Sequence, residues 1–352
     1  MTTTLTPPLS AALRDHTRAA HEHAEDPSGR PGGRGCAEGP AHSEHHRHAQ
    51  ASRPASPRAG RAPPCGPYDG PMSQTAPASQ NHDAVPALAL AIAGSEATGG
   101  AGAQADLKTF QELGVFGIVA LTCIVSFDPE DDWNHRFFPV PTEILQQQLD
   151  AIQGDYPERL RTVKLGMQGS PEVIRTSAAA LRRAEWDHVV LDPVLICKGQ
   201  EPGHALDTDQ ALKAELLPLA TFTTPNHFET EQLSGMTVRS VEDLTAAARR
   251  IHEISGAAVL AKGGMHLPGP DAVDVFVDGD TVEVLSAPKI GQSGVSGAGC
   301  SLAAAVTAEL AKGATTLEAA RRAKEFVRAG IAQAVEGRTP FAALWQGGLR
   351  SA

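Results

Sequence analysis

The sequence has few cysteines, an excess of acidic over basic residues and no long apolar run. Its five cysteines are widely spaced, so they indicate neither a disulfide framework nor a zinc site, and a reducing cytoplasm is the expected compartment. Lys and Arg total 30 against 41 Asp and Glu, which argues against nucleic acid or an anionic membrane as the main partner. No apolar stretch reaches the roughly eighteen residues of a spanning helix, and the N-terminus lacks the apolar core of a secretory signal.

The beginning of the chain differs in composition from the rest. Residues 1–86 hold 13 of the 26 prolines and 8 of the 14 histidines. Such a segment buries too little apolar surface to offset its ordering entropy, so we predict a disordered tail over 1–85. The cluster HSEHHRH carries side chains that bind metals, but biased composition within a tail is the favoured interpretation. Met72, just before the predicted order begins, is a candidate alternative translation start.

After residue 86, apolar runs alternate with amphipathic segments. Repeated strand–helix alternation predicts an α/β fold with a mostly parallel central sheet and helices on both faces. Asp278-Gly279 predicts a small β-hairpin at the sheet edge near 272–286, which suits a homodimer. We predict the other strands at 87–94, 117–125, 161–167, 188–196, 220–225 and 257–264, and helices at about 105–114, 141–153, 170–184, 208–217, 226–234, 240–254, 298–312 and 315–336.

The stretch SGVSGAGCSLAAAV places small residues and a cysteine at the start of a predicted helix. A helix N-terminus exposes backbone N–H groups and a partial positive charge. Gly297, Ala298 and Gly299 let the backbone approach an anion closely, which suits phosphate. Cys300 lies in the first turn, where we expect a lowered thiol pKa, so the sulfur either attacks as a nucleophile or takes a proton from a hydroxyl attacking phosphorus. A small-residue helix start with an inert buried cysteine is the structural alternative.

Three further motifs follow predicted strands. GSEATGGAGAQADLKT is a second glycine-rich strand-to-helix loop, but it is not a Walker motif. In TPNHFE, Asn226 and Glu229 are spaced to face one Mg²⁺–phosphate assembly, or else to cap a surface helix. In AKGG, Lys262 places an ammonium beside two glycines at the carboxyl end of a strand. Ligands of such sheets bind at the carboxyl ends of strands, so these motifs predict one common site.

Seven stretches in a fixed order carry a resemblance to a known family. They are IAGSEATGGAGAQADLKTFQELGVFG, FDPEDDWNHRFFPV, KLGM, VVLDPVLICKG, LLPLATFTTPNHFETEQLSGM, AVDVFVDG and GAGCSLAAAVTAELAKGA. Through them the chain from about 87 to 336 resembles the ribokinase-like vitamin kinases, and within these it is similar to bacterial pyridoxine/pyridoxal kinases related to hydroxymethylpyrimidine kinases. The resemblance implies a kinase domain over 86–338 and a C-terminal tail over 339–352.

The resemblance also implies an activity and a set of site residues. The activity is ATP- and Mg²⁺-dependent phosphorylation of the 5′-hydroxymethyl group of pyridoxal, pyridoxine or pyridoxamine, with Gly297, Ala298 and Gly299 as anion hole, Cys300 as catalytic base and Glu229 as the metal element. The residues implied in the vitamin pocket are Glu96, Gly100, His135, Met167, Val194 and, in a lid loop, Cys197. Those implied around the nucleotide are Asn226, Lys262, Gly263, Gly264, Met265, His266, Asp274, Gly299 and Lys324.

Two departures from the family pattern leave other functions open. Glu96 stands where the family usually has Asp, and Val295-Ser296 stand where Thr-His is usual. Hydroxymethylpyrimidine or its monophosphate is therefore an alternative substrate. A non-catalytic vitamer-binding protein is an alternative of another class, although the retained Cys300 and Glu229 argue against it because a binder needs neither a base nor a metal element.

Overall fold

The computed structural model describes residues 85–195, 202–291 and 293–351. The predicted tail, apart from Val85, lies outside the described residues, as does Cys197. Nine strands among the described residues form one sheet: β1 (Leu88–Glu96), β2 (Phe116–Asp128), β3 (Asn134–Pro139), β4 (Thr162–Leu165), β5 (His188–Leu191), β6 (Phe222–Thr223), β7 (Ala258–Gly264), β8 (Asp271–Asp278) and β9 (Thr281–Pro288). Their order across the sheet is β3-β2-β1-β4-β5-β6-β7-β8-β9.

The middle of the sheet is parallel and its two edges are antiparallel. Strands β2, β1, β4, β5, β6 and β7 pair in parallel with their neighbours. Strand β3 runs antiparallel to β2 at one edge, and β8 and β9 are antiparallel at the other. The predicted α/β fold with a mostly parallel sheet and a hairpin edge is therefore confirmed. Because parallel strands share one direction, their carboxyl ends meet along a single edge of the sheet.

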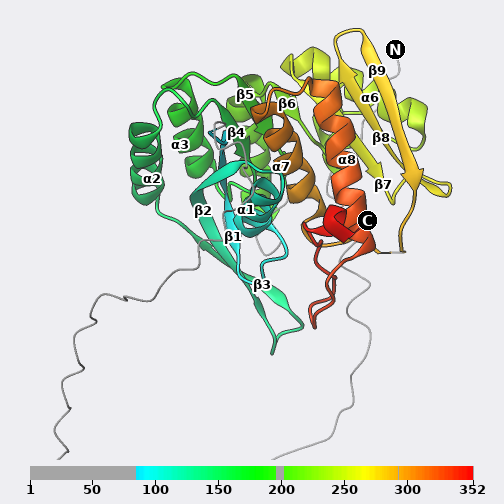
Figure 1. The fold of residues 1–352 in the computed structure, drawn as a ribbon, viewed down its shortest axis with the longest axis horizontal. Helices are drawn as coiled ribbons and strands as arrows, with labels where there is room; N and C mark the ends of the chain where they lie inside the picture. The colour runs from blue at the N-terminus through cyan, green and yellow to red at the C-terminus, as the bar shows by residue number, and fades with distance from the viewer. Residues whose placement is uncertain (1–84, 196–201, 292, 352) are drawn as a thin grey trace, which may run out of the picture. The chain divides into compact units, whose positions relative to one another are not determined.

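Helices cover both faces of this sheet (Figure 1). They are α1 (Gly102–Glu112), α2 (Thr142–Asp155), α3 (Pro171–Arg182), α4 (Pro202–Ala211), α5 (His227–Ser234), α6 (Val241–Ser255), α7 (Ala298–Ala311) and α8 (Thr316–Ala332). Buried side chains of α2, α3 and α6 belong to one hydrophobic cluster. Those of α1, α7 and α8 belong to two other clusters, to which α2, α3 and α6 contribute no side chain. The sheet is thus the middle of three layers, as its apolar strands require.

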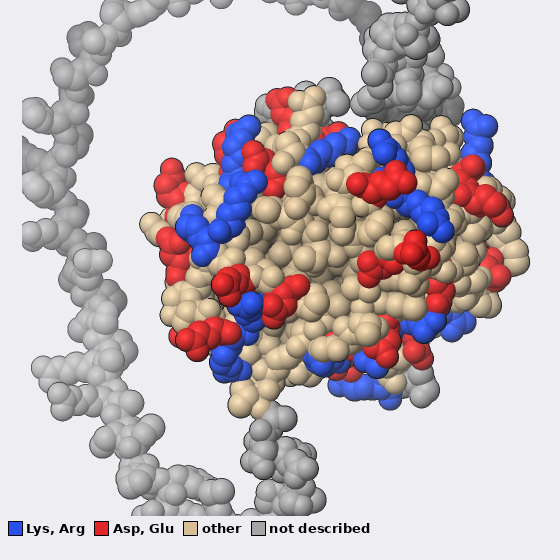
Figure 2. Space-filling model, turned by 90° about the horizontal axis from the view of Figure 1, so that it is seen from above, with Lys and Arg blue, Asp and Glu red and all other residues tan. Residues whose placement is uncertain are grey.

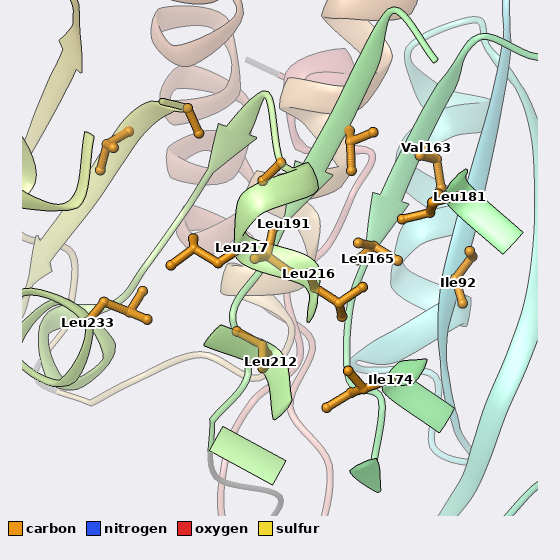
Figure 3. Close-up of a cluster of buried hydrophobic side chains, with 14 of the residues drawn as sticks. Ile92, Val163, Leu165, Ile174, Leu181, Leu191, Leu212, Leu216, Leu217 and Leu233 are labelled. Atoms are coloured by element: carbon orange, nitrogen blue, oxygen red, sulfur yellow. The ribbon is translucent and has the colours of Figure 1, made fainter. Parts of the chain in front are cut away.

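The larger cluster is a continuous layer of branched aliphatic side chains (Figure 3). Leu165 of β4 and Leu191 of β5 are register partners, and both are fully buried. Ile174 of α3 packs into the same cluster, as do Leu212 and Leu216 from a π-helical turn, Leu212–Leu216, that follows α4. Strands buried on both faces must be apolar throughout, which explains the continuous apolar runs in the sequence.

Side-chain caps fix the start of several helices. Ser240, where the predicted helix 240–254 begins, accepts a hydrogen bond from the backbone N–H of Asp243 at 3.1 Å and caps α6. At α8, Thr315 and Glu318 form a full capping box. Each cap satisfies backbone N–H groups that the helix itself leaves unpaired.

The structure differs from the predicted elements in two places near the site. Strand β5 ends at Leu191 rather than at 196, because Asp192-Pro193 follows and proline cannot donate to the next ladder bond. Strand β3, which the sequence did not predict, pairs its His135 with Phe127 of β2. A tight turn precedes it, in which Asp132 and Trp133 adopt positive φ.

The end of the chain packs against the start of α7. The backbone N–H of Ser296 donates to Ala342 O at 2.8 Å, and that of Leu344 donates to Ser296 O at 3.0 Å. Leu344 is buried, and the Gln346 side chain donates to Ser301 Oγ at 3.1 Å. The sequence predicts a tail over 339–352, but part of this segment packs beside the residues just before the predicted anion site.

The described surface carries both signs of charge. On the face in Figure 2, Lys and Arg lie among Asp and Glu around a mostly uncharged centre, with no broad basic area among the described residues. No helix in the described part of the chain combines the length and the apolar character that crossing a membrane requires.

Candidate active site

Two glycine-rich loops contact each other at the carboxyl-end edge of the sheet. The first connects β1 to α1, and the second leads into α7. Gly297, the residue that caps α7, has φ of +77°, and a Cβ there would overlap the carbonyl oxygen of Gly100. A Cβ at Gly100 would in turn come within 3.4 Å of Ser296 Oγ. Only glycine fits at Gly297, so the start of α7 is held directly against the loop after β1.

The first turn of α7 is suited to an anion. The residues before Ser301 are Gly297, Ala298, Gly299 and Cys300, and no side chain of the described residues caps this helix. The Lys262 ammonium lies 3.5 Å from where a Cβ of Gly299 would stand. Backbone N–H groups, the positive end of α7 and a nearby ammonium therefore converge on one place. Binding of phosphate at this place stays a prediction.

Cys300 has a raised thiol pKa rather than the lowered one that its position at a helix start suggested. Burial raises the pKa of Cys300 to about 11, with the carboxylates of Asp192 and Asp106 acting in the same direction. The Lys164 ammonium and a hydrogen bond with the backbone N–H of Gly102 oppose this rise. The expectation of a lowered pKa was wrong because loss of hydration outweighs the helix end and the cation.

A buried cluster of charges lies below the start of α7. Lys262 at the end of β7 donates to Asp192 Oδ1 at 3.4 Å, and Thr224 Oγ1 donates to the same oxygen at 3.3 Å. Burial raises the pKa of Glu229 to about 8, although the Lys262 ammonium acts against that rise. Two acidic groups thus face one ammonium at the place where β5, β6 and β7 end.

Asn226 and Glu229 form a capping box at the start of α5. The backbone N–H of Glu229 donates to Asn226 Oδ1 at 2.9 Å, and the backbone N–H of Asn226 donates to Glu229 Oε2 at 2.8 Å. Both readings of TPNHFE are therefore compatible with the geometry, because the pair caps a helix while the Glu229 carboxylate also lies within the charge cluster. Their role toward a metal and phosphate remains a prediction.

Residues expected around a nucleotide occupy the end of β7, the turn that follows it and the neighbouring strand β8. Gly263 and Gly264 are the last two residues of β7, and a Cβ at Gly263 would overlap the carbonyl oxygen of Val273 on β8. Met265 and His266 follow, both exposed, and the His266 ring lies 5.2 Å from the His227 ring of α5. The structure brings this turn and the anion site together through Lys262.

Asp274 and Lys324 form an ion pair between β8 and α8. The Lys324 ammonium donates to Asp274 Oδ2 at 2.7 Å and to Ala272 O at 3.0 Å. Both side chains are mostly buried, with exposed fractions of 14% for Lys324 and 11% for Asp274. The pair links α8 to the sheet. Its contribution to a nucleotide pocket stays a prediction.

Glu96 organises the loop after β1 with both carboxylate oxygens. Oε1 accepts from the backbone N–H and the hydroxyl of Thr98 at 2.6 and 2.7 Å, and Oε2 accepts from the N–H groups of Gly100 and Ala101 at 2.9 and 3.1 Å. Glu96 is 7% exposed, so the structure does not leave it as a solvated loop carboxylate. These four hydrogen bonds fix the backbone of the loop after β1, in which Gly100 lies against the start of α7.

The other residues expected in a vitamin pocket come from three elements. Met167 follows β4, and its carbonyl oxygen accepts from Thr122 Oγ1 at 2.7 Å. Val194 follows β5, and its N–H donates to Asp192 O at 2.8 Å. His135 lies on β3, with its ring 4.5 Å from that of Phe127. These positions follow the same edge of the sheet, whereas Cys197 lies outside the described residues.

The sequence contained three charged site residues that motif reasoning missed. Asp192 directly follows the apolar run VVL, and a carboxylate at the end of a buried strand is a recognisable signal. Lys164 stands inside the apolar stretch TVKL, where a cation requires a buried partner. That partner, Asp106 on α1, is 58 residues away in sequence and could not have been identified from spacing.

This fold, with a small-residue helix start and a thiol where two glycine loops meet, defines a ribokinase-like small-molecule kinase. The phosphomethylpyrimidine kinase family model matches residues 96–341. The chain is 46% identical over 248 residues to pyridoxine kinase of Bacillus subtilis, covering 69% of this chain and 89% of that protein. The chain belongs to the phosphomethylpyrimidine kinase family and is a phosphotransferase that acts on an alcohol group.

Other relatives and solved structures agree with this assignment. Hydroxymethylpyrimidine/phosphomethylpyrimidine kinase of Rhizobium meliloti is 40% identical over 249 residues, covering 70% of this chain and 91% of that protein. The Bacillus subtilis pyridoxal kinase, solved as an ADP complex, matches with a TM-score of 0.72 at 43% identity, over 76% of this chain and 100% of that chain. Staphylococcus aureus pyridoxal kinase with AMP-PCP and pyridoxal matches with a TM-score of 0.69 at 36% identity, over 76% and 95%.

Proposed function

We propose that this protein transfers a phosphoryl group from ATP to the 5′-hydroxymethyl group of pyridoxal, pyridoxine or pyridoxamine, and so salvages vitamin B6. The observation that carries the proposal is the contact between Gly297 and Gly100. It joins the start of α7, where Cys300 lies, to the loop expected to face the vitamin. The match to pyridoxine and pyridoxal kinases supports the same substrate.

In this proposal the residues at the start of α7 stabilise the moving phosphoryl group. Phosphoryl transfer requires in-line positioning and neutralisation of charge, with little covalent work by the protein. The backbone N–H groups of Gly297 and Gly299 are assigned to the transferred group, whereas the Ala298 N–H donates to Val295 O at 3.3 Å, and the Lys262 ammonium adds positive charge beside Gly299. The thiolate form of Cys300 takes the proton of the substrate hydroxyl as the new O–P bond forms and the bond between the terminal phosphate and ADP breaks.

A magnesium ion fits the donor set near Lys262. Glu229 is buried, and burial raises its pKa to about 8, so a bound cation would favour its charged form. Glu229 would hold Mg²⁺ together with phosphate oxygens of ATP. The ion would supply positive charge that neutralises negative charge on the phosphates of ATP.

The remaining expectations extend this proposal to the whole chain. The reaction takes place in the cytoplasm, the kinase domain begins near residue 86, and the hairpin of β8 and β9 contributes to a homodimer. Met265 and His266 border the nucleotide together with Asp274 and Lys324. Neither nucleic acid nor a membrane is an expected partner.

The activity is tested with the purified full chain, Mg-ATP and two competing substrates, pyridoxal and hydroxymethylpyrimidine. We expect pyridoxal 5′-phosphate to accumulate, with a larger kcat/KM for pyridoxal than for the pyrimidine. Chromatography of both products from one reaction measures that ratio. A preference for the pyrimidine, the substrate class suggested by the Rhizobium relative, would replace the proposed substrate. Tight vitamin binding by calorimetry without ATP consumption would instead identify a vitamer-binding protein.

A further inference from the structure

Lys164 and Asp106 form an ion pair that is completely buried in the protein. The Lys164 ammonium donates to both oxygens of Asp106 at 2.8 Å, and neither side chain is exposed. Removing two charges from water costs several kcal/mol per ion, and an apolar pair of similar volume is often as stable. The function proposed above gives neither residue a role, so the position of the pair calls for an explanation.

The pair joins α1 and β4, two elements that both pack against α7, the helix that carries Cys300. Asp106 belongs to α1, and four residues earlier the first residue of that helix, Gly102, hydrogen-bonds through its backbone N–H with Cys300. Lys164 belongs to β4, and a Cβ on Gly166 of the same segment would stand only 3.0 Å from the Lys164 ammonium. Fixing Asp106 against Lys164 therefore fixes the start of α1 against the sulfur. Glycine at 166 leaves room for the ammonium.

Four charged side chains act on the Cys300 thiol from different elements. Lys164 of β4 and Lys262 of β7 attract a thiolate, whereas Asp106 of α1 and Asp192 after β5 repel it. Among these groups, Lys164 exerts the largest effect on the thiol, and it opposes the larger effect of burial. The positive ends of α1 and α7 act in the same direction as the two ammonium groups.

We propose that Lys164, oriented by Asp106, is a positioning residue for the kinase reaction: it supplies the buried positive charge that keeps Cys300 ready to accept the hydroxyl hydrogen, and the pair holds the Gly102 N–H on the sulfur. The inference rests on the proposed role of Cys300 as base. It differs from that role in that its main test needs no substrate, because the thiolate can be measured directly.

The test measures the pH at which Cys300 becomes reactive. Brief alkylation with iodoacetamide across a pH series, followed by mass spectrometry of the peptide containing Cys300, gives the midpoint of thiolate formation separately from the other cysteines. Lys164→Met should raise that midpoint by about one pH unit or more, and below the midpoint kcat should fall about tenfold for each unit. The KM for ATP should stay within about twofold of the original, because no phosphate contact is removed.

Companion variants separate this role from a purely structural one. Asp106→Asn removes a repelling charge while leaving Lys164 in place, so it should lower the midpoint, opposite in sign to Lys164→Met. The double variant Lys164→Met/Asp106→Leu replaces the pair by apolar groups and provides a folded protein even if the single variant does not fold. Its midpoint should also rise. Arg175→Met breaks the exposed pair with Glu172 and should leave the midpoint unchanged.

The outcomes are distinguishable from failure of the kinase proposal. A raised midpoint together with a lower kcat in the Lys164 variants supports the positioning role, whatever substrate the enzyme prefers. An unchanged midpoint in a folded Lys164→Met or double variant would overturn the inference and leave the pair as a structural contact. A raised midpoint without any change in kcat would show that the charge acts on the thiol but that the thiol is not the base.

Discussion

Replacing Cys300 with alanine is expected to lower kcat for pyridoxal phosphorylation by about 10²–10⁴-fold, the range in which a general base contributes. The substitution removes the group that takes the hydroxyl hydrogen, while the first turn of α7 and its backbone N–H groups stay in place. The KM for ATP should therefore change little, because ground-state contacts to the nucleotide remain. Steady-state kinetics with pyridoxal and Mg-ATP measure both quantities.

The matched control is Cys123→Ala. Cys123 is a second described thiol, but it is buried within β2, where burial raises its pKa to about 11 and packing is its expected role. Its replacement should leave kcat within a few-fold of the original. Normal turnover by Cys300→Ala would remove the thiol from the mechanism and require another base.

Gly297→Ala is expected to reduce kcat by about 10²–10³-fold, the loss caused by removing a donor that stabilises transition-state charge. Two physical effects combine at this position. A left-handed backbone conformation costs a non-glycine residue about 1–2 kcal/mol, and the new methyl group would overlap the carbonyl oxygen of Gly100. The start of α7 must therefore move away from the loop after β1, which displaces the backbone N–H groups and Cys300.

Gly313→Ala separates the two effects. Gly313 lies just after the other end of α7 and has φ of +89°, similar to the +77° of Gly297, but a Cβ there meets no atom within 4 Å. Gly313→Ala should therefore lower the free energy of unfolding without lowering kcat. Thermal denaturation and kinetics of both variants give the comparison. Equal kcat losses at the two positions would show that contact between the loops is not required for catalysis.

The order of strands and helices could be predicted because it depends on local patterns. Apolar strands such as the one before Gly94 are covered on both faces, and the cap at Ser240 is visible in the sequence alone. The helix start at 297–300 could be predicted for the same reason, since small residues before a helix have a local geometric meaning, while phosphate binding there stays a prediction. Strand β3 could not be predicted, because residues of the run WNHRFF form a strand through their pairing with β2, which the local pattern does not reveal.

Interactions between distant segments account for most of what the sequence did not reveal. Lys164 inside the apolar stretch TVKL indicates that a buried partner is needed, but Asp106 is unremarkable in local sequence, and only the folded chain joins the two. The chain end beside Ser296 was separated as a tail because its sequence does not continue the family pattern, yet Leu344 packs into the core. The pKa of Cys300 was mispredicted since helix position is local whereas burial is a property of the whole fold.

The most direct test of the account is a crystal structure of this protein with AMP-PCP, Mg²⁺ and pyridoxal bound together. The account predicts backbone N–H groups of the first turn of α7 at about 3 Å from oxygens of the terminal phosphate. It also predicts Cys300 Sγ within hydrogen-bond reach of the 5′-hydroxyl oxygen, on the side of the Lys164–Asp106 pair. A complex in which the sulfur faces away from that hydroxyl, or in which the terminal phosphate lies outside the turn at 297–300, would contradict it.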